Sequence, residues 1–188
     1  MIRLLIKLYR ISIAVIILIA GVTFERTGLI ELLSDPYEYP VIMELFMQHL
    51  YMVTLSMTFA TVIGITAGVL LTRKRFRRYA GICMYIIGLG QTIPSLAVLA
   101  LAMSFLGIGT KPAVFALTIY SILPIARNTL AGITAVPPEL IEAGKGMGMP
   151  PIKILMEVEI PNAMKVILTG FRVALIINIG TAALAYVI

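Results

Sequence analysis

The residues most suggestive of chemistry are three glycines spaced around a lysine. In the stretch "EAGKGMG", Gly144, Gly146 and Gly148 stand at every second position, and Lys145 lies among them. Loops of this composition often hold phosphate groups, because glycine lets backbone N–H groups approach an anion while lysine adds positive charge. The stretch therefore raises the hypothesis of a nucleotide site.

The order of these residues does not fit a phosphate-binding motif. A P-loop reads G-x-x-x-x-G-K followed by Ser or Thr, whereas here Lys145 is followed by Gly146. The dinucleotide pattern G-x-G-x-x-G needs its third glycine at the position that Met149 occupies. The sequence also lacks an acidic strand of the Walker B type, so we expect no nucleotide binding by this chain itself.

The composition of the chain is that of a membrane protein. Its 188 residues are 60% hydrophobic and 13% charged, and the mean hydropathy is +1.03. Soluble domains average about 45–50% apolar and about 25% charged residues. Cys83 and His49 are the only residues of their types, which excludes an internal disulfide and a Cys/His zinc cluster.

Apolar runs divide the chain into candidate membrane spans. Each run is long enough, or nearly so, to cross about 30 Å of hydrocarbon as a helix. The sequence therefore predicts an all-α, polytopic membrane helical bundle with about five spans. The first run could instead be a signal peptide, but no clear A-x-A cleavage site follows it, so we expect a retained helix. The runs are 11–24, 50–72, 79–106, 113–135 and 163–188.

The basic residues predict how the chain is oriented in the membrane. Of its fifteen basic residues, thirteen fall on one side of an alternating topology, while the gap 25–48 is acidic. The positive-inside rule then places the N-terminus in the cytoplasm and residues 25–48 outside. "DPYEYP" (35–40) is predicted to form an external turn. The thirteen are Arg3, Lys7, Arg10, Arg73, Lys74, Arg75, Arg77, Arg78, Arg127, Lys145, Lys153, Lys165 and Arg172.

Small and polar residues interrupt the third run, and a weaker interruption lies in the fourth. Pro94 removes a backbone donor and frees a carbonyl one turn earlier, which in lipid needs another partner. Two interpretations stay open: a kinked helix packed by small residues, or a bend that lines a pathway. The interrupting residues are Gly88, Gly90, Gln91, Thr92, Pro94 and Ser95, with Tyr120, Ser121 and Pro124 in the fourth run.

The segment 137–160 is predicted to form two short helices at the membrane surface. Pro137-Pro138 suits a first helical turn, and Gly148 can end that helix in a left-handed conformation. A second helix restarts at Pro150-Pro151, and we expect Pro161 to break it and open the last span. The predicted apolar faces are Leu140, Ala143, Gly144 and Met147 on the first helix, and Ile152, Leu155 and Met156 on the second.

Alanine and glycine leave the middle of the first of these faces almost without side chains. Another backbone could therefore approach closely at Ala143 and Gly144. A short rigid helix with such a notch can transmit a rigid-body displacement.

This segment resembles the cytoplasmic signature of permease subunits of ABC importers, with the type I, methionine-permease-like fold. The signature is E-A-A, three residues, Gly, nine residues and I-x-L-P. Here Glu142-Ala143-Gly144 is followed by Gly148 and by Val158-Glu159-Ile160-Pro161 at the same spacing. The departures, Gly144, Val158 and Ile160, are small or conservative. The resemblance is closest to the osmoprotectant branch, in "QTIPSLAVLAL", "YSILPIARNT" and "VPPELIEAGKGMG".

The resemblance implies a domain organisation and a function. Residues 1–47 would hold an extra transmembrane helix and an external acidic loop, and 48–188 the permease domain with coupling helices at 137–160. The function would be ATP-driven import of glycine betaine, choline, carnitine or similar quaternary amines. A permease for another small solute, such as ergothioneine, an amino acid or a sulfonate, is the alternative. Family members usually have another span, so a sixth is expected beyond residue 188.

The resemblance also implies partners and site residues. Two permease subunits, identical or different, would form the pore in the inner or plasma membrane of a prokaryote. Separate ATPase subunits would bind ATP and Mg²⁺, so no cofactor is expected in this chain, and an external binding protein would deliver the substrate. The coupling residues would be Glu142, Ala143, Gly144, Gly148 and Pro161. The pathway residues would be Gln91, Thr92, Pro94, Ser95, Tyr120 and Pro124.

Two other classes of protein remain as alternatives. A membrane-embedded enzyme would need paired carboxylates, a metal set or an activated nucleophile, and the apolar runs hold almost no ionisable residues apart from Arg127, Lys165 and Arg172 at their borders. A channel would need rings of carbonyls or charges, and none is evident. The coupling signature accounts for more of the sequence than either.

Overall fold

The structure is a computed structural model that describes residues 2–26, 28, 31–32, 35–90 and 92–185. It divides into two compact units, Met1–Gln48 and His49–Ile188. Helix α1 (Ile2–Arg26) belongs to the first unit, and α3 (Glu38–Thr72) begins there and continues into the second.

The predicted turn at 35–40 is shorter than expected. The Asp35 side chain accepts a hydrogen bond from the Tyr37 N–H at 2.8 Å, and the Asp35 carbonyl accepts one from the Tyr39 N–H at 3.0 Å. Helix α3 then begins at Glu38, well before the predicted start at residue 50. Pro40 lies in its first turn, where a helix needs no N–H donor.

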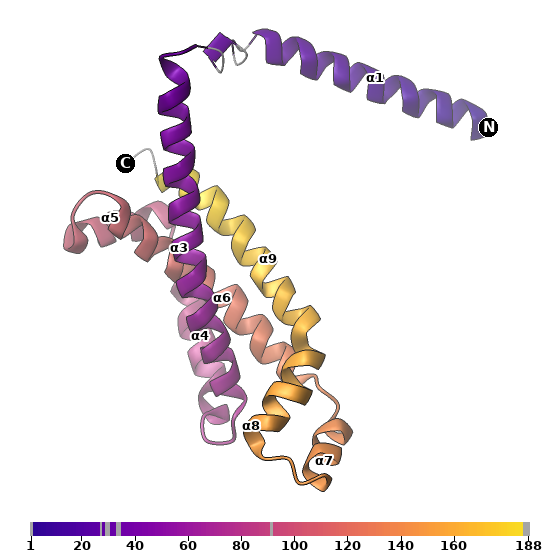
Figure 1. Ribbon diagram of the computed structural model, residues 1–188, viewed down its shortest axis with the longest axis vertical. Helices are drawn as coiled ribbons and strands as arrows, with labels where there is room; N and C mark the ends of the chain where they lie inside the picture. Colours follow the sequence, from indigo (N-terminus) through magenta and orange to yellow (C-terminus); the bar gives the residue numbers. More distant parts are fainter. Residues whose placement is uncertain (1, 27, 29–30, 33–34, 91, 186–188) are drawn as a thin grey trace. The chain divides into compact units, whose positions relative to one another are not determined.

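The second unit is a bundle built around three long helices. The stretches long and apolar enough to cross a membrane, among the residues described, are Glu38–Thr72, Thr110–Thr134 and Pro151–Ala185. The last two contain α6 (Thr110–Thr134) and α9 (Ile160–Ala185), which pack side by side (Figure 1). Ile125, Ala126 and Ala174 are fully buried in the contact between α6 and its neighbours.

Glycines allow these helices to approach closely. A Cβ added at Gly68 of α3 would lie 2.5 Å from the Thr129 Cβ, and one at Gly64 would lie 2.9 Å from the Ile125 Cβ. Gly64 and Gly68 are spaced as in the G-x-x-x-G packing motif of membrane helices. On the other side of α6, a Cβ at Gly170 of α9 would lie 2.6 Å from the Pro124 carbonyl oxygen. Helix α6 therefore packs between α3 and α9, and at these glycines the helices are too close to leave room for a Cβ.

A buried polar cluster joins the same three helices. The Asn178 amide nitrogen of α9 donates to the Ser121 hydroxyl of α6 at 2.8 Å and to the Ser56 hydroxyl of α3 at 3.0 Å. All three side chains are fully buried. Buried polar groups in a bilayer need internal partners, and these residues supply them to one another.

The predicted third span is two short helices and not one kinked helix. After the 3₁₀ turn η1 (Arg77–Tyr79), α4 covers Ala80–Gly90 and α5 covers Ser95–Leu106. Pro94, with φ −54° and ψ 136°, caps the start of α5. Proline can begin a helix but cannot continue one without losing a hydrogen bond, so α5 starts anew, and neither helix alone has the length of a span.

Candidate functional site

The first surface helix, α7 (Pro138–Gly146), begins and ends as its sequence predicts. Pro137 precedes it in an extended conformation, and Pro138 is its first residue. At the other end, Gly148 has φ +74°. The Gly148 N–H donates to the Lys145 carbonyl at 2.9 Å, and the Met149 N–H to the Gly144 carbonyl at 3.1 Å. This pair of bonds is a Schellman motif, which fixes the end of the helix.

The notch predicted at Gly144 is filled by the chain itself. Gly144 is buried, and a Cβ added there would lie 3.3 Å from the Ile154 Cγ1 and 3.4 Å from the Met149 Sδ. The expectation that another backbone could approach at this point is therefore wrong for Gly144. Three other members of the predicted face are exposed: Leu140 at 42%, Met147 at 73%, and Ala143. They form an outward apolar surface on α7.

The second surface helix differs from its prediction in two ways. Helix α8 (Pro151–Ile154) buries Ile154, while Ile152 and Met156 of the predicted stripe are exposed. It continues through a π-helical turn, η2 (Leu155–Glu159), directly into α9. Pro161 therefore does not break the helix, because the wider turn accommodates its ring.

Hydrogen bonds in and after the π-helical turn replace those that an α-helix would make. The Ile160 N–H donates to the Leu155 carbonyl, five residues earlier. The Asn162 side-chain amide donates to the Val158 carbonyl at 2.7 Å. The carbonyls of Leu155 and Val158, both within this turn, are thus bonded.

An apolar cluster seats this surface segment against the long helices. Ile141 of α7 and Leu155 of η2 contribute to it from the surface side. The cluster thus brings α7 and η2 into contact with the ends of three long helices. The cluster contains Ile133, Val136, Ala163 and Ile167, with Ile65, Val69, Ile141 and Leu155 packed against them.

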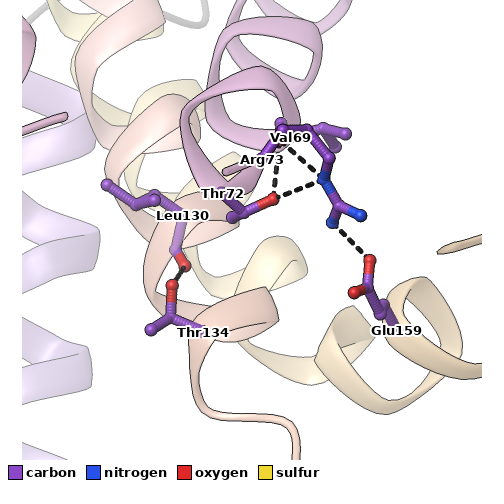
Figure 2. Close-up of polar contacts among 6 residues, drawn as sticks. All are labelled: Val69, Thr72, Arg73, Leu130, Thr134 and Glu159. Carbon is purple, nitrogen blue, oxygen red and sulfur yellow. Dashed lines mark hydrogen bonds and ion pairs between the residues drawn. The ribbon is translucent and has the colours of Figure 1, made fainter. Parts of the chain in front are cut away.

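An ion pair lies beside this apolar cluster. Arg73, just after α3, donates from its guanidinium to the carboxylate of Glu159, the last residue of η2 (Figure 2). The Arg73 Nε also donates to the Thr72 hydroxyl at 2.9 Å. The Glu159 side chain is 10% exposed and that of Arg73 is 33% exposed. The pair places the basic segment 73–78 at the same end of the bundle as η2.

The predicted pathway residues do not share one surface. Gln91 lies outside the described residues. Thr92 is exposed and lines a groove of about 810 Å³ together with Arg77 and Arg127. Ser95 lines a separate, small cavity with Leu99 and Thr181.

Tyr120 and Pro124 are buried in α6. The Tyr120 hydroxyl donates to the Ile93 carbonyl, in the break just before Pro94. The Ile93 carbonyl, directly before Pro94, thus has a partner within the protein; it is not the carbonyl one turn earlier that Pro94 was predicted to free. Pro124 faces α9 at Gly170, where its carbonyl accepts from the Asn128 amide at 2.8 Å. Of the predicted pathway residues that the structure describes, only Thr92 lines the large groove.

The predicted coupling residues lie together at one end of the second unit. Glu142 and Ala143 are exposed on α7, Gly144 is buried beneath them, and Gly148 follows the helix. Pro161 is exposed in the first turn of α9. Within the described residues, no group of three or more His, Cys, Asp or Glu side chains is placed to hold a metal ion.

Sequence reasoning missed the polar residues and glycines through which the helices contact one another. Asn178 stands out in principle, because an amide in an apolar run must find a partner. Gly64 and Gly68 carry the G-x-x-x-G signal. Glu159 falls inside the signature, but nothing local indicates Arg73 as its partner.

The chain belongs to the family of binding-protein-dependent transport system inner membrane components, which residues 60–188 match. It is thus a membrane protein of the ABC importer permease class. The osmoprotectant import permease protein OsmY of Salmonella typhimurium is 50% identical over 141 residues, which are 75% of this chain and 60% of the relative. The carnitine transport permease protein OpuCB of Listeria monocytogenes is 41% identical over 138 residues, 73% of this chain and 62% of the relative.

The similarity extends to solved structures and to most of the second unit. The inward-facing MetNI methionine ABC transporter matches with a TM-score of 0.65 and 28% identity, over 80% of this chain and 75% of that one. An amino acid ABC transporter crystallised with histidines matches with a TM-score of 0.65 and 25% identity, over 83% and 75% of the two chains. The chain spans about 60% of the length of the first of its curated relatives.

Proposed function

We propose that the chain is the membrane-spanning permease subunit of an ATP-driven importer of osmoprotectants of the quaternary amine class. Its relatives carry names for osmoprotectant import and carnitine transport, and another, at 40% identity, is a choline transport system permease protein of Bacillus subtilis. Because the family is one of transport-system membrane components, the chain is not an enzyme, and ATP and Mg²⁺ would bind to a separate ATPase subunit.

The observation that carries the coupling role is the exposed apolar surface of α7 above a buried seat. Leu140, Ala143 and Met147 face outward, which leaves an apolar patch on and just after α7 that a partner protein would cover. Beneath it, Ile141 and Leu155 join the cluster that holds the long helices. An ATPase bound to α7, near Glu142, would therefore move the bundle as a rigid body.

The same arrangement supports the proposed topology, and the family supports the proposed partners. The ion pair to Arg73 holds the basic segment 73–78 and η2 at one end, as expected if both face the cytoplasm under the positive-inside rule. The N-terminus would then be cytoplasmic as well, in the cell membrane of a prokaryote. A second permease subunit and an external binding protein would complete the importer, with Thr92 on the groove beside the pathway.

An amino acid is the second candidate substrate. The matching solved structures are a methionine transporter and an amino acid transporter, at 28% and 25% identity. The relatives named for osmoprotectants and carnitine are more similar, at 50% and 41% identity. We therefore assign the quaternary amine class first.

Uptake by the assembled transporter in proteoliposomes tests the assignment. The complete permease, its ATPase and its binding protein would be supplied with labelled glycine betaine, carnitine, choline and methionine. We expect ATP-dependent accumulation of at least one quaternary amine, competed by the others and unaffected by methionine. Accumulation of methionine alone, or of none of the four, would refute the substrate class.

A further inference from the structure

We propose that the Arg73–Glu159 ion pair is the link through which motion of the surface segment reaches α3, so that its loss uncouples ATP hydrolysis from transport. The inference rests on the proposed permease function and goes beyond it, because it assigns a positioning role to two residues on different elements. Both lie at the junction that Figure 2 shows.

Arg73 is bound to the end of α3 along one edge of its guanidinium. Its Nε donates to the Thr72 hydroxyl at 2.9 Å and to the Val69 carbonyl at 3.4 Å. The Thr72 hydroxyl in turn donates to the Val69 carbonyl at 2.6 Å. A cation at this place is favoured, because the last carbonyls of a helix carry partial negative charge. The Nη2 of the same guanidinium donates to the Glu159 carboxylate.

Glu159 has little access to water and depends on this partner. Its side chain is 10% exposed, and Arg73 is the group that its carboxylate meets in the described part of the chain. The pair is partly buried, and removing Arg73 would leave the Glu159 carboxylate uncompensated where water has little access, which is destabilising. The pair is therefore a direct, specific contact between two side chains, and not a long-range attraction between exposed charges.

The position of Glu159 makes the pair a mechanical junction. It is the last residue of the π-helical turn that separates α8 from α9. Such turns often occur at functional sites, because their widened geometry differs from that of the helix on either side. A displacement passed from α7 and α8 into this turn would reach α9 through the backbone. It reaches α3 through the side chain of Glu159.

Within the described residues, the contacts of Arg75, Arg78, Lys153 and Glu157 are local. Arg75 and Arg78 lie over the rings of Phe76 and Tyr79, which follow them directly. The Lys153–Glu157 pair, at 3.9 Å, joins residues one helical turn apart, and its side chains are 52% and 57% exposed. An exposed pair of this kind contributes little. Lys153 and Glu157 therefore provide a matched control on the same segment.

Packing beneath the pair should hold the fold when the charges are removed. Val69 of α3 and Leu155 of η2 both pack against the cluster of Ile133 and Ala163. Neutral side chains at 73 and 159 leave these apolar contacts in place. The expected defect is therefore a loss of coupling in an assembled complex.

A double-mutant cycle in the complete transporter tests the proposal. Arg73→Gln, Glu159→Gln and the double variant would be reconstituted with ATPase and binding protein, and ATP hydrolysed per substrate imported would be measured. We expect each single variant to raise this ratio at least about fivefold, the lower end of typical coupling between sites. The double variant should be no worse than the poorer single variant, because both changes remove one link.

Three further measurements separate the possible failures. Lys153→Gln with Glu157→Gln should leave the ratio unchanged, and Arg73→Lys, which keeps the charge, should keep most of the coupling. Unchanged ratios in both single variants, or additive losses in the double variant, would overturn the proposal. If a glutamine variant does not assemble, Arg73→Lys or Glu159→Asp replaces it in the cycle, and additive losses there would contradict the link in the same way. Failure of the wild-type complex to import would count against the proposed function instead.

Discussion

At the scale of single residues, the three glycines of "EAGKGMG" have three different structural roles. Gly144 makes room for Ile154 and Met149, whereas a Cβ at Gly146 would meet nothing within 4 Å. Gly148 also has open space around it but holds φ +74°. Its role is therefore conformational, because residues with a Cβ rarely adopt this backbone region. None of the three roles involves a phosphate.

This difference predicts opposite effects of alanine at neighbouring positions. Gly148→Ala should loosen the end of α7 by about 1 kcal/mol, the usual cost of a left-handed conformation for a residue with a side chain. Gly146→Ala should be neutral or stabilise the helix by about 0.5–1 kcal/mol, since alanine favours helix more than glycine. Hydrogen exchange of the amides at 143–149 in nanodiscs measures both. Faster exchange in Gly146→Ala than in Gly148→Ala would contradict the assignment.

The buried amide of Asn178 gives a second prediction at this scale. Asn178→Leu removes the hydrogen bonds to Ser56 and Ser121 and should lower the free energy of unfolding by about 1–2 kcal/mol, because buried hydroxyls lose their partners. Denaturant titration in detergent measures this change. The control is Ile176→Leu, at a position that is 73% exposed. Equal stability of the two variants would show that the cluster contributes nothing.

At the scale of elements, local rules predicted what local forces determine. Pro137, Pro138 and Gly148 place both ends of α7, since capping depends on neighbouring residues. The prediction that Pro161 breaks the helix was wrong, because the π-helical turn that ends at Glu159 accommodates its ring. The filling of the Gly144 notch by Ile154 and the pairing of Arg73 with Glu159 depend on tertiary contacts. No periodicity in the sequence reports such contacts.

The close approach of α3 to α6 predicts a strong effect of one added methyl group. Gly68→Ala would place its Cβ 2.5 Å from the Thr129 Cβ, and the overpacking should lower the free energy of unfolding by about 1–3 kcal/mol. Gly81→Ala in α4, with nothing within 4 Å, is the matched control. Thermal unfolding in detergent compares them. Indistinguishable midpoints would mean that α3 and α6 are not packed at this distance.

At the scale of the molecule, composition and charge predicted an all-α membrane protein, and the family match confirms the class. The number of spans was harder to predict. A run such as 79–106 has the composition of one span but folds as α4 and α5. Hydropathy depends only on the composition along the chain. It therefore does not predict that Pro94 starts a new helix within this run.

The shared end of segment 73–78 and the surface helices predicts their accessibility. In a Cys83→Ala background, Arg75→Cys and Lys145→Cys should react with a membrane-impermeant thiol reagent only after the cells are opened, because both would face the cytoplasm in the proposed topology. Ile108→Cys, in the exposed turn between α5 and α6, should react in intact cells. Opposite labelling of positions 75 and 145 would contradict their placement at one end.

The hydrogen bonds of Asn178 also bear on the order of assembly during synthesis. Helices α3 and α6 emerge from the ribosome before α9, so Ser56 and Ser121 enter the membrane before their amide partner exists. Ser56 has a hydrogen-bond partner before α9 is made, because its hydroxyl also donates to the Val53 carbonyl of its own helix at 3.1 Å. Asn178 has no such bond among its recorded contacts, which all reach α3 or α6. Helix α9 therefore carries the residue that requires α3 and α6 to be in place, which favours assembly of these three helices in the order of synthesis.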